Sequence, residues 1–177
     1  MGVLMPTKQL DKLKQLAAGI GYLYADELQA IIDVAEALPA NPLCVNIGSG
    51  AGTSVLAVML TRSDAVMYDI DITPDNGVAQ MREFGLADSA NWHRLMGDSK
   101  TVTLPIVAEL DYLFIDGDHS DAGLRGDLRQ WLPLVKRGGV VLIHDYERDV
   151  WPDVSRVTDE VMGNVGRLID TLKVFTV

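Results

Sequence analysis

The chain has a single cysteine, Cys44, among its 177 residues. One cysteine cannot form an intrachain disulfide, so the fold must be held by a hydrophobic core alone. Hydrophobic residues make up 48% of the chain, and a chain of this length can bury a core of that kind. Cys44 lies at the start of an apolar run, and we expect it to fill space inside the core.

Positive charge is also scarce, because the 15 Lys and Arg residues are outnumbered by 25 Asp and Glu residues. Proteins that bind nucleic acid contact its phosphates through clusters of Lys and Arg, so we expect no nucleic-acid partner. No apolar run approaches the ~20 residues that span a bilayer, and the N-terminal residues do not have the pattern of a secretion signal. These absences predict a soluble, cytoplasmic protein that does not contact a membrane.

Short apolar segments alternate with segments whose apolar residues recur at helical spacing. We predict strands at 43–47, 65–70, 92–96, 110–115, 140–143 and 172–177. We predict helices at 7–18, 26–38, 53–62, 76–84, 121–135 and 154–162. Strands that are apolar throughout and alternate with helices indicate a parallel sheet covered on both faces. The expected fold is therefore a doubly wound, mostly parallel, three-layer α/β/α sandwich.

Polar residues follow each of the first five predicted strands. In chain order these strand ends read NIGSGAGTS, DID, GDS, DGDH and HDY. Open α/β sheets bind their ligands outside the carboxyl ends of the strands. Asp116, in the DGDH segment, therefore belongs to a row of polar groups along one edge of the sheet, and we expect the functional site at this edge.

A glycine-rich turn, residues 48–52, joins the first predicted strand to the helix that begins at Thr53. Glycines there permit positive φ and close approach of a ligand, and the helix start offers free N–H groups to an anion. We place Asp69 at the end of the second strand, where it could accept hydrogen bonds from both hydroxyls of a ribose. These features predict a nucleoside-bearing cofactor. We interpret Asp71 as a solvated loop acid.

Four stretches together resemble the class I S-adenosylmethionine-dependent methyltransferases, in particular the small O-methyltransferase branch with its catechol-type and cephalosporin-hydroxylase-like members. They are VNIGSGAGTS, MYDIDI, MGDS and LDYLFIDGDHSDAGLRGDLRQWLPLVKRGGVVLIHDY. The resemblance implies a Rossmann-like methyltransferase fold. It also implies transfer of a methyl group from S-adenosylmethionine, with a hydroxyl of a small molecule as the first expectation for the acceptor.

The sequence shows no linker, repeat or low-complexity tract, so we expect a single methyltransferase domain over residues 1–177. Within it, 1–40 would be a helical N-terminal segment, 41–145 the cofactor-binding core, and 146–177 a C-terminal helix and strand. The substrate pocket is expected to be either open or completed by a second subunit of a homo-oligomer.

The resemblance implies a set of cofactor contacts around the glycine turn. Gly48 and Gly50, with Ser49 between them, would lie under the methionine part of the cofactor. Ser54 would hold the methionine carboxylate. Asn46 takes a place where family members usually carry Glu or Asp, and it would accept a hydrogen bond from the cofactor's amino group without supplying charge.

The remaining cofactor contacts implied by the resemblance follow the later strands. Asp69 would hold the ribose and Ile70 would pack on the adenine. Asp98 and Ser99 would reach the edge of the adenine, and Asp116 would face the sulfonium end.

The resemblance also implies two catalytic features beside the cofactor. Asp116 and Asp145 match ligands of Mg²⁺ in metal-dependent members, but Tyr146 takes the third ligand place and is a poor ligand for magnesium. A neighbouring histidine, His144, would favour a softer divalent metal, although we interpret it as structural. His119 stands where catechol-type members carry a lysine that acts as general base. With an unperturbed pKa near ~6.5 it suits proton removal, or else it caps the turn.

Three other functions stay open at this point. The acceptor could be a nitrogen or a sugar instead of a small-molecule hydroxyl. The chain could be a catalytically degenerate binding module, which Asn46 and Tyr146 favour and the retained acids at strand ends oppose. It could bind NAD as an oxidoreductase, but the GxGxG spacing differs from the GxGxxG of dinucleotide sites. Trp151 either packs in the core or lines a substrate pocket.

Overall fold

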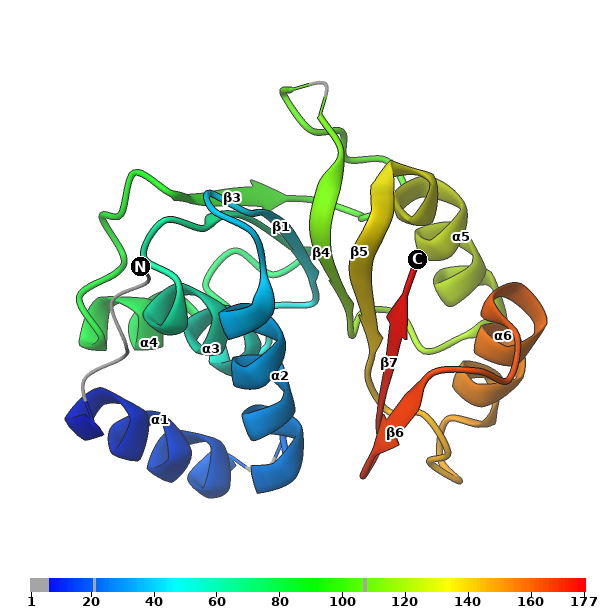
Figure 1. The fold of residues 1–177 in the computed structure, drawn as a ribbon, viewed down its shortest axis with the longest axis horizontal. Coiled ribbons are helices and arrows are strands. Elements are labelled where there is room, and N and C mark those ends of the chain that lie inside the picture. The colour runs from blue at the N-terminus through cyan, green and yellow to red at the C-terminus, as the bar shows by residue number, and fades with distance from the viewer. Residues whose placement is uncertain (1–6, 21, 107) are drawn as a thin grey trace.

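The computed structural model describes residues 7–20, 22–106 and 108–177, and it shows one seven-stranded sheet with the order β3-β2-β1-β4-β5-β7-β6 (Figure 1). The neighbouring pairs among the first five strands are parallel, β7 runs antiparallel to β5, and β6 runs antiparallel to β7. The strands are β1 (Leu43–Ile47), β2 (Val66–Asp71), β3 (Trp92–Met96), β4 (Leu110–Ile115), β5 (Val135–Ile143), β6 (Arg167–Ile169) and β7 (Leu172–Thr176). The predicted doubly wound, mostly parallel sheet is confirmed.

Helices cover both faces of this sheet. In Figure 1 one face carries α1 (Thr7–Ile20), α2 (Ala25–Ala37), α3 (Thr53–Thr61) and α4 (Val78–Glu83). The opposite face carries α5 (Asp121–Trp131) and α6 (Pro152–Met162). The strand order reverses between β1 and β4, and in doubly wound sheets ligands bind at the carboxyl ends of strands beside such a reversal.

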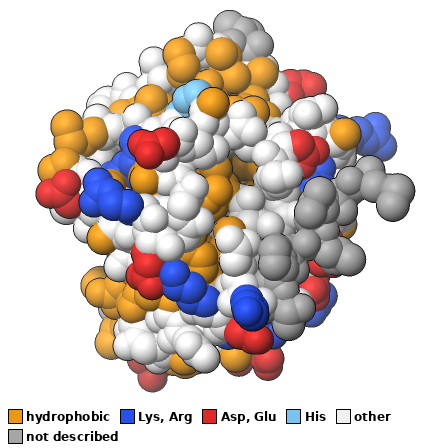
Figure 2. All heavy atoms as spheres, turned by 90° about the vertical axis from the view of Figure 1, so that its left-hand side faces the viewer, with side chains coloured by type: hydrophobic (Ala, Val, Ile, Leu, Met, Phe, Trp, Pro, Cys, Tyr) orange, Lys and Arg blue, Asp and Glu red, His pale blue; other side chains and the backbone are white. Residues whose placement is uncertain are grey.

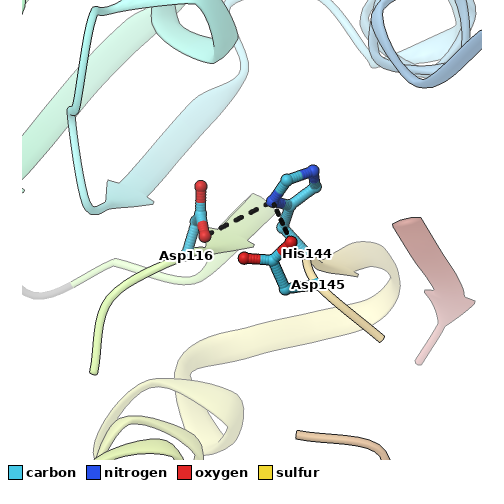
Figure 3. Close-up of side chains that lie close together, drawn as sticks. All are labelled: Asp116, His144 and Asp145. Carbon is cyan, nitrogen blue, oxygen red and sulfur yellow. Dashed lines mark ion pairs between the residues drawn. The ribbon is translucent and has the colours of Figure 1, made fainter. Parts of the chain in front are cut away.

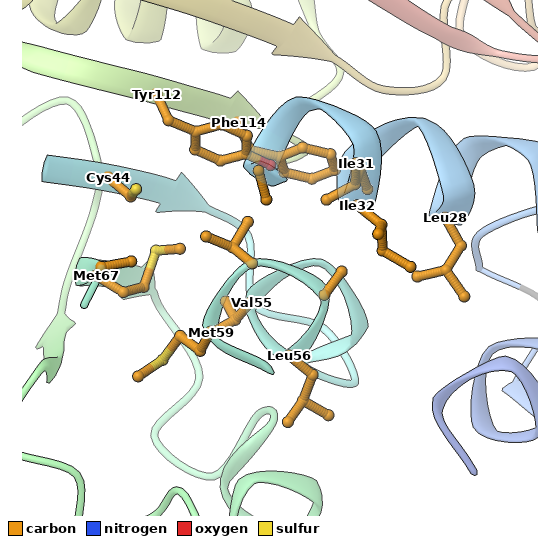
Figure 4. Packing of buried hydrophobic residues seen from close by; sticks show 14 of the residues in the cluster. Leu28, Ile31, Ile32, Cys44, Val55, Leu56, Met59, Met67, Tyr112 and Phe114 are labelled. Carbon is orange, nitrogen blue, oxygen red and sulfur yellow. The ribbon is translucent and has the colours of Figure 1, made fainter. Parts of the chain in front are cut away.

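Two hydrophobic clusters fill the space between the sheet and the helices. The first lies under the N-terminal helices and includes Leu28, Ile31, Leu56 and Cys44 (Figure 4). Cys44 is fully buried there, as predicted. The second cluster lies under α5 and α6 and is centred on Trp131. Because α3 is packed against the sheet and also against α1 and α2, it is apolar on nearly all sides.

The observed elements differ from the sequence prediction mainly in four places. Strand β5 starts at Val135 rather than at 140, and its pairing with β4 shifts register between Leu110 and Tyr112. The helix predicted at 121–135 ends at Trp131 and continues as a 3₁₀ turn, Leu132–Leu134, that contains a proline. The short strand β6 was not predicted. Strand β2 ends at Asp71 rather than at residue 70, so Asp71 belongs to the strand and not to the loop after it.

Figure 2 shows the side of the molecule on which α1 and α4 lie in Figure 1. On this face Lys and Arg side chains lie beside Asp and Glu side chains. Lys12 of α1 and Glu83 of α4 form an ion pair in which Nζ and Oε1 are 3.0 Å apart. Among the described residues, every helix is too short or too polar to cross a membrane.

Candidate functional site

The carboxyl ends of the parallel strands open onto two adjoining cavities. The β2 cavity, about 540 Å³, lies over the ends of β1 and β2 and reaches the loop after β3. The β5 cavity, about 430 Å³, lies over the ends of β4 and β5. Gly48, Gly50 and Asp116 line both cavities, so the two meet at the glycine turn. The site therefore lies at the edge of the sheet where the sequence predicted it.

The glycine turn touches the end of β4 so closely that its first residue must be glycine. Gly48 has a φ of +84°, and a Cβ at this position would lie 2.0 Å from the carbonyl oxygen of Asp116. Gly52, with a φ of +78°, forms the N-cap of α3. The glycines therefore bring bare backbone to the point where the two cavities meet.

Asp71 fastens the glycine turn to the end of β2. Its Oδ2 accepts the backbone N–H of Ser49 at 2.8 Å and its Oδ1 accepts that of Thr73 at 2.7 Å. Burial alone would raise the pKa of Asp71, but these hydrogen bonds and one from Asn76 lower it below its usual value. The expectation of a solvated loop acid was wrong, because Asp71 is the last residue of β2 and only 8% exposed.

Asp69, which the sequence analysis expected to contact the ribose, is buried beneath the glycine turn. Asp69 is 1% exposed and lines neither of these two cavities. Its carboxylate accepts hydrogen bonds from Ser49 Oγ at 2.5 Å and from Trp92 Nε1 at 3.2 Å. Burial raises its pKa. Asp69 thus stabilises the glycine turn through its hydrogen bond from Ser49, and the acid that faces the β2 cavity is Asp71.

Asn46 is also turned inward. Its Nδ2 donates to the Gly48 carbonyl at 3.1 Å and to Asp69 at 3.2 Å, and its Oδ1 accepts from Ser54 Oγ at 2.9 Å. Asn46 is 1% exposed and, like Asp69, lines neither cavity, so its predicted contact with the cofactor's amino group has no support in the geometry. Ser54 and Ser49 do line the β5 cavity.

The other residues predicted for the cofactor gather around the β2 cavity. Ile70, Asp98 and Ser99 line it, but the Ser99 hydroxyl already donates to Asp127. Ile72, which the sequence analysis did not select, lines the same cavity and is 75% exposed, whereas Ile70 is 1% exposed. A flat ligand in this cavity would therefore rest mainly on Ile72.

Two acids and two histidines converge in the β5 cavity. His119 Nε2 lies 3.2 Å from Asp116 Oδ1 and 2.9 Å from Asp145 Oδ2. His144 Nδ1 lies 3.4 Å from Asp116 Oδ1 and 3.6 Å from Asp145 Oδ1 (Figure 3). The structure therefore brings together Asp116, His119 and Asp145 as predicted, and it adds His144, which we had interpreted as structural.

These contacts change the proton affinity of the site. Burial alone would lower the pKa of His119, but Asp116 and Asp145 raise it to about 9. Burial would likewise lower the pKa of His144, yet Asp116 and Glu27 raise it to about 10. Burial would raise the pKa of Asp116, but the two histidines hold it well below its usual range. The value near 6.5 assumed for His119 from sequence therefore does not describe the folded protein without ligands.

Glu27, from α2, is the group that sequence reasoning missed. It is fully buried, and its Oε2 lies 3.2 Å from His144 Nε2. Its Oε1 accepts both the N–H and the Oγ1 hydroxyl of Thr171, at 2.8 and 2.7 Å. The only local signal was the acid three residues after Tyr24, the N-cap of α2, and this pattern indicates a helix cap rather than a site.

Two aromatic residues after β5 bear on the predicted roles at this site. The Tyr146 hydroxyl donates to Asp159 at 2.8 Å, so it points away from the acids and cannot act as the third metal ligand. Trp151 lines the β5 cavity and stacks on the His119 ring, with centroids 4.7 Å apart. Of the two interpretations of Trp151, the structure supports the pocket wall.

Comparison with known proteins identifies the family. Residues 45–146 match the family described as methyltransferase domain. A curated protein of Mycobacteroides abscessus, named as a candidate O-methyltransferase, is 30% identical over 65% of this chain, and the chain spans about half (54%) of that relative.

Solved structures share the fold. The Podospora anserina methyltransferase PaMTH1, solved with SAH, has a TM-score of 0.69 at 14% identity, covering 98% of this chain and 88% of its own. The O-methyltransferase TomG of Streptomyces achromogenes, solved with SAM, has a TM-score of 0.66 at 17% identity, covering 92% and 81%. The chain therefore belongs to the methyltransferase domain family, and it has the class I S-adenosylmethionine-dependent methyltransferase fold that its motifs predicted.

Proposed function

We propose that the protein transfers the methyl group of S-adenosylmethionine to a hydroxyl group of a small molecule. The observation that carries this proposal is the meeting of two different cavities at Gly48 and Asp116. One cavity has the features of a nucleoside site, and the other is lined by groups that bind and deprotonate a hydroxyl. The volume of the β5 cavity, about 430 Å³, falls within the range of small-molecule sites.

In this proposal the β2 cavity holds the nucleoside. Asp71 takes the ribose role that the sequence analysis gave to Asp69, because its Oδ1 accepts a hydrogen bond only from Thr73 among the described residues and keeps a free lone pair. Ile72 packs on the adenine, and Asp98 lies at its edge. The methionine part extends over Gly48 and Gly50 towards Ser54, near the start of α3, where N–H groups suit its carboxylate.

The acceptor hydroxyl lies in the β5 cavity, between Trp151 and the acids. Asp116 and Asp145 are suited to hold a divalent cation, which would polarise the acceptor oxygen and favour its ionised form. We propose His119 as the base, because its ring stacks on Trp151 in the wall of the same cavity and its Nε2 lies 3.2 Å from Asp116 and 2.9 Å from Asp145. Most of the rate gain would come from holding the oxygen in line with the sulfonium methyl group.

Calorimetric titration of S-adenosylmethionine into the purified protein tests the cofactor. We expect micromolar binding that Asp71→Asn weakens at least ten-fold, since the ribose loses a charged acceptor. Asp75→Asn, an exposed acid in the same loop, is the matched control and should bind like the wild type. NAD titrated in parallel tests the oxidoreductase alternative. Equal affinity in wild type and Asp71→Asn would contradict the assignment of Asp71, and absence of binding would contradict the proposal.

A second experiment tests the acceptor. The protein is incubated with S-adenosylmethionine labelled at the methyl group and with sets of phenols, sugars and amines, and label in the product is measured. We expect transfer to a hydroxyl-bearing set. Transfer to amines alone would contradict the O-methyl assignment while leaving methyl transfer in place. Cofactor binding without transfer to any set would favour the degenerate binding module.

A further inference from the structure

We propose that the site is a transition-metal site in which His144 Nδ1 is the third ligand beside Asp116 and Asp145, and that Glu27 positions this histidine. The inference deepens the proposed function, on which it rests for the catalytic use of the metal. The metal site itself follows from the arrangement of the side chains. His144 takes the ligand place of Tyr146, whose hydroxyl is turned towards Asp159.

The spacing of the donor atoms suits a single ion. Nδ1 of His144 lies 3.4 Å from Asp116 Oδ1 and 3.6 Å from Asp145 Oδ1 (Figure 3). Two donors that each lie about 2.1 Å from one metal ion are about 3.0 to 3.4 Å apart at right-angled or tetrahedral geometry. The observed spacings are at or slightly above this range, so a small inward movement of the side chains would complete the coordination.

The Nδ1 atom of His144 is buried without a hydrogen-bond partner in the described part of the chain, which also supports a bound cation. The side chain is 3% exposed. A buried polar atom without a partner is costly, and in a native protein it calls for an explanation such as a bound ion or water. Here the unpartnered nitrogen faces two carboxylates, an environment that attracts a cation.

Glu27 fixes which nitrogen of His144 is free to bind. Its Oε2 lies 3.2 Å from Nε2, and as a carboxylate it can only accept, so the proton of the neutral ring lies on Nε2. The lone pair is then on Nδ1, facing Asp116 and Asp145. Histidine ligands of metals commonly donate their second N–H to a carboxylate in this way. Thr171 and the backbone N–H of Tyr24 hold Glu27 itself in place.

The backbone explains how two consecutive residues reach one ion. Neighbouring side chains of an extended strand point to opposite faces of the sheet. Strand β5 ends at Ile143, and Asp145, two residues further on, has a φ of +58°, in the left-handed region. This reversal lets the side chains of His144 and Asp145 both face Asp116. Aspartate tolerates this conformation better than most residues, but it carries a cost that a bound cation would offset.

One imidazole and two carboxylates favour borderline metals such as Mn²⁺, Fe²⁺, Co²⁺ or Zn²⁺ over Mg²⁺, which prefers oxygen ligands. His119 is left outside the ligand set. Its ring stacks on Trp151 in the wall of the β5 cavity, and its Nε2 contacts the same two acids. The site would thus separate the two histidines, His144 binding the metal and His119 serving as base.

The test uses Mn²⁺ with the purified full chain, without cofactor. We expect the pulsed electron paramagnetic resonance spectrum to show coupling to nitrogen, changed by ¹⁵N-histidine labelling. The coupling should persist in His119→Gln and be lost in His144→Gln. Glu27→Gln should weaken Mn²⁺ binding about 10- to 100-fold, whereas Glu36→Gln, an exposed acid of the same helix, should not. Mg²⁺ should compete at least ten-fold more weakly than Zn²⁺.

A wild-type protein that binds no Mn²⁺, or binds it without histidine nitrogen coupling, would overturn the inference. Coupling that survives His144→Gln would do the same. The wild-type spectrum alone can overturn the proposal, so the test does not depend on whether a variant folds. No cofactor is present, and failure of this site is therefore distinguishable from failure of S-adenosylmethionine binding in calorimetry.

Discussion

Gly48 and Asp116 are in direct backbone contact, and this contact joins the glycine turn after β1 to the end of β4. The carbonyl oxygen of Asp116 occupies the space that a side chain at position 48 would need. Because Gly48 and Asp116 line both cavities, the contact also sets the spacing between the proposed cofactor and the proposed metal ligand.

Gly48→Ala is expected to destabilise the fold strongly. The new Cβ would lie 2.0 Å from the Asp116 oxygen, and the φ of +84° disfavours alanine. Overpacking and left-handed strain together should cost about 3 kcal/mol or more. Gly138→Ala is the control, because Gly138 has a similar φ of +81° but nothing within 4 Å of its Cβ. Urea denaturation would measure both. Equal losses would show that the backbone contact contributes nothing.

Asp69→Asn and Asp71→Asn are expected to have different effects. Asp69 is buried under the turn and accepts from Ser49 and Trp92, so its replacement should mainly lower the thermal unfolding midpoint. Asp71 faces the β2 cavity, so its replacement should mainly weaken S-adenosylmethionine binding. Calorimetry at a temperature where both variants are folded would compare them. If Asp69→Asn lost the greater part of the affinity, the original assignment of the ribose contact would be restored.

His119→Asn should lower kcat by about 10²- to 10⁴-fold, the range typical of a lost general base, with a smaller change in KM. The comparison variant is His93→Gln on β3, where the ring stacks on Tyr68 and lines neither cavity. Steady-state kinetics with the acceptor found in the screen would measure both. A His119→Asn enzyme with wild-type kcat would show that His119 only caps the turn.

The metal-free protein is expected to lose stability as pH rises from about 6.5 to 10. Histidine titrates near ~6.5 in an unfolded chain, whereas Glu27 and Asp116 raise the pKa of folded His144 to about 10. The stabilisation is therefore complete below pH 6.5, where both states are protonated, and is lost as pH rises through the folded pKa. His119, with a pKa of about 9, acts in the same direction.

Urea denaturation in EDTA at pH 6, 8 and 10 would measure this loss. Glu27→Gln should flatten the pH dependence and, at pH 6, lower the free energy of unfolding by about 3 kcal/mol, because it removes one of the two acids that stabilise the buried His144 cation. Glu36→Gln should leave the wild-type curve unchanged. A Glu27→Gln curve parallel to that of the wild type would show that Glu27 does not set the protonation of His144.

Most strands were predictable because they are short, mainly apolar runs ended by polar residues. Trp92–Met96 and Leu110–Ile115 were placed at their observed bounds, and Leu43–Ile47 likewise. The start of β5 was missed because the two glycines at 138–139 resemble a turn, whereas the strand passes through them with a register shift. Strand β6 has three residues and pairs only with β7, so it leaves almost no periodic signal.

The choice between Asp69 and Asp71 reflects the period of a strand. Residues two apart point to the same face, so the sequence pattern alone does not distinguish Asp69 from Asp71, which differ in their depth along β2. The choice depended on where the strand ends, and strand ends are the least certain part of a sequence prediction. Moving the end by two residues moves the proposed ribose contact from Asp69 to Asp71 and the proposed adenine contact from Ile70 to Ile72.

The role of Glu27 could not be predicted from local pattern. Its partner His144 is 117 residues away in the chain, and the contact exists only once α2 has packed across the end of β5. On sequence alone a glutamate near the start of a helix is a capping residue, and Glu27 is that as well. Only its complete burial beside a histidine reveals the second role.

The hydrogen bonds from Thr171 to Glu27 have a consequence for biosynthesis. Thr171 lies in the turn between β6 and β7, 144 residues after Glu27. A ribosome must therefore translate the chain as far as Thr171 before α2 can complete its contacts around His144. Until then, Glu27 and His144 lack a member of their network, and the proposed metal site is incomplete in the nascent chain.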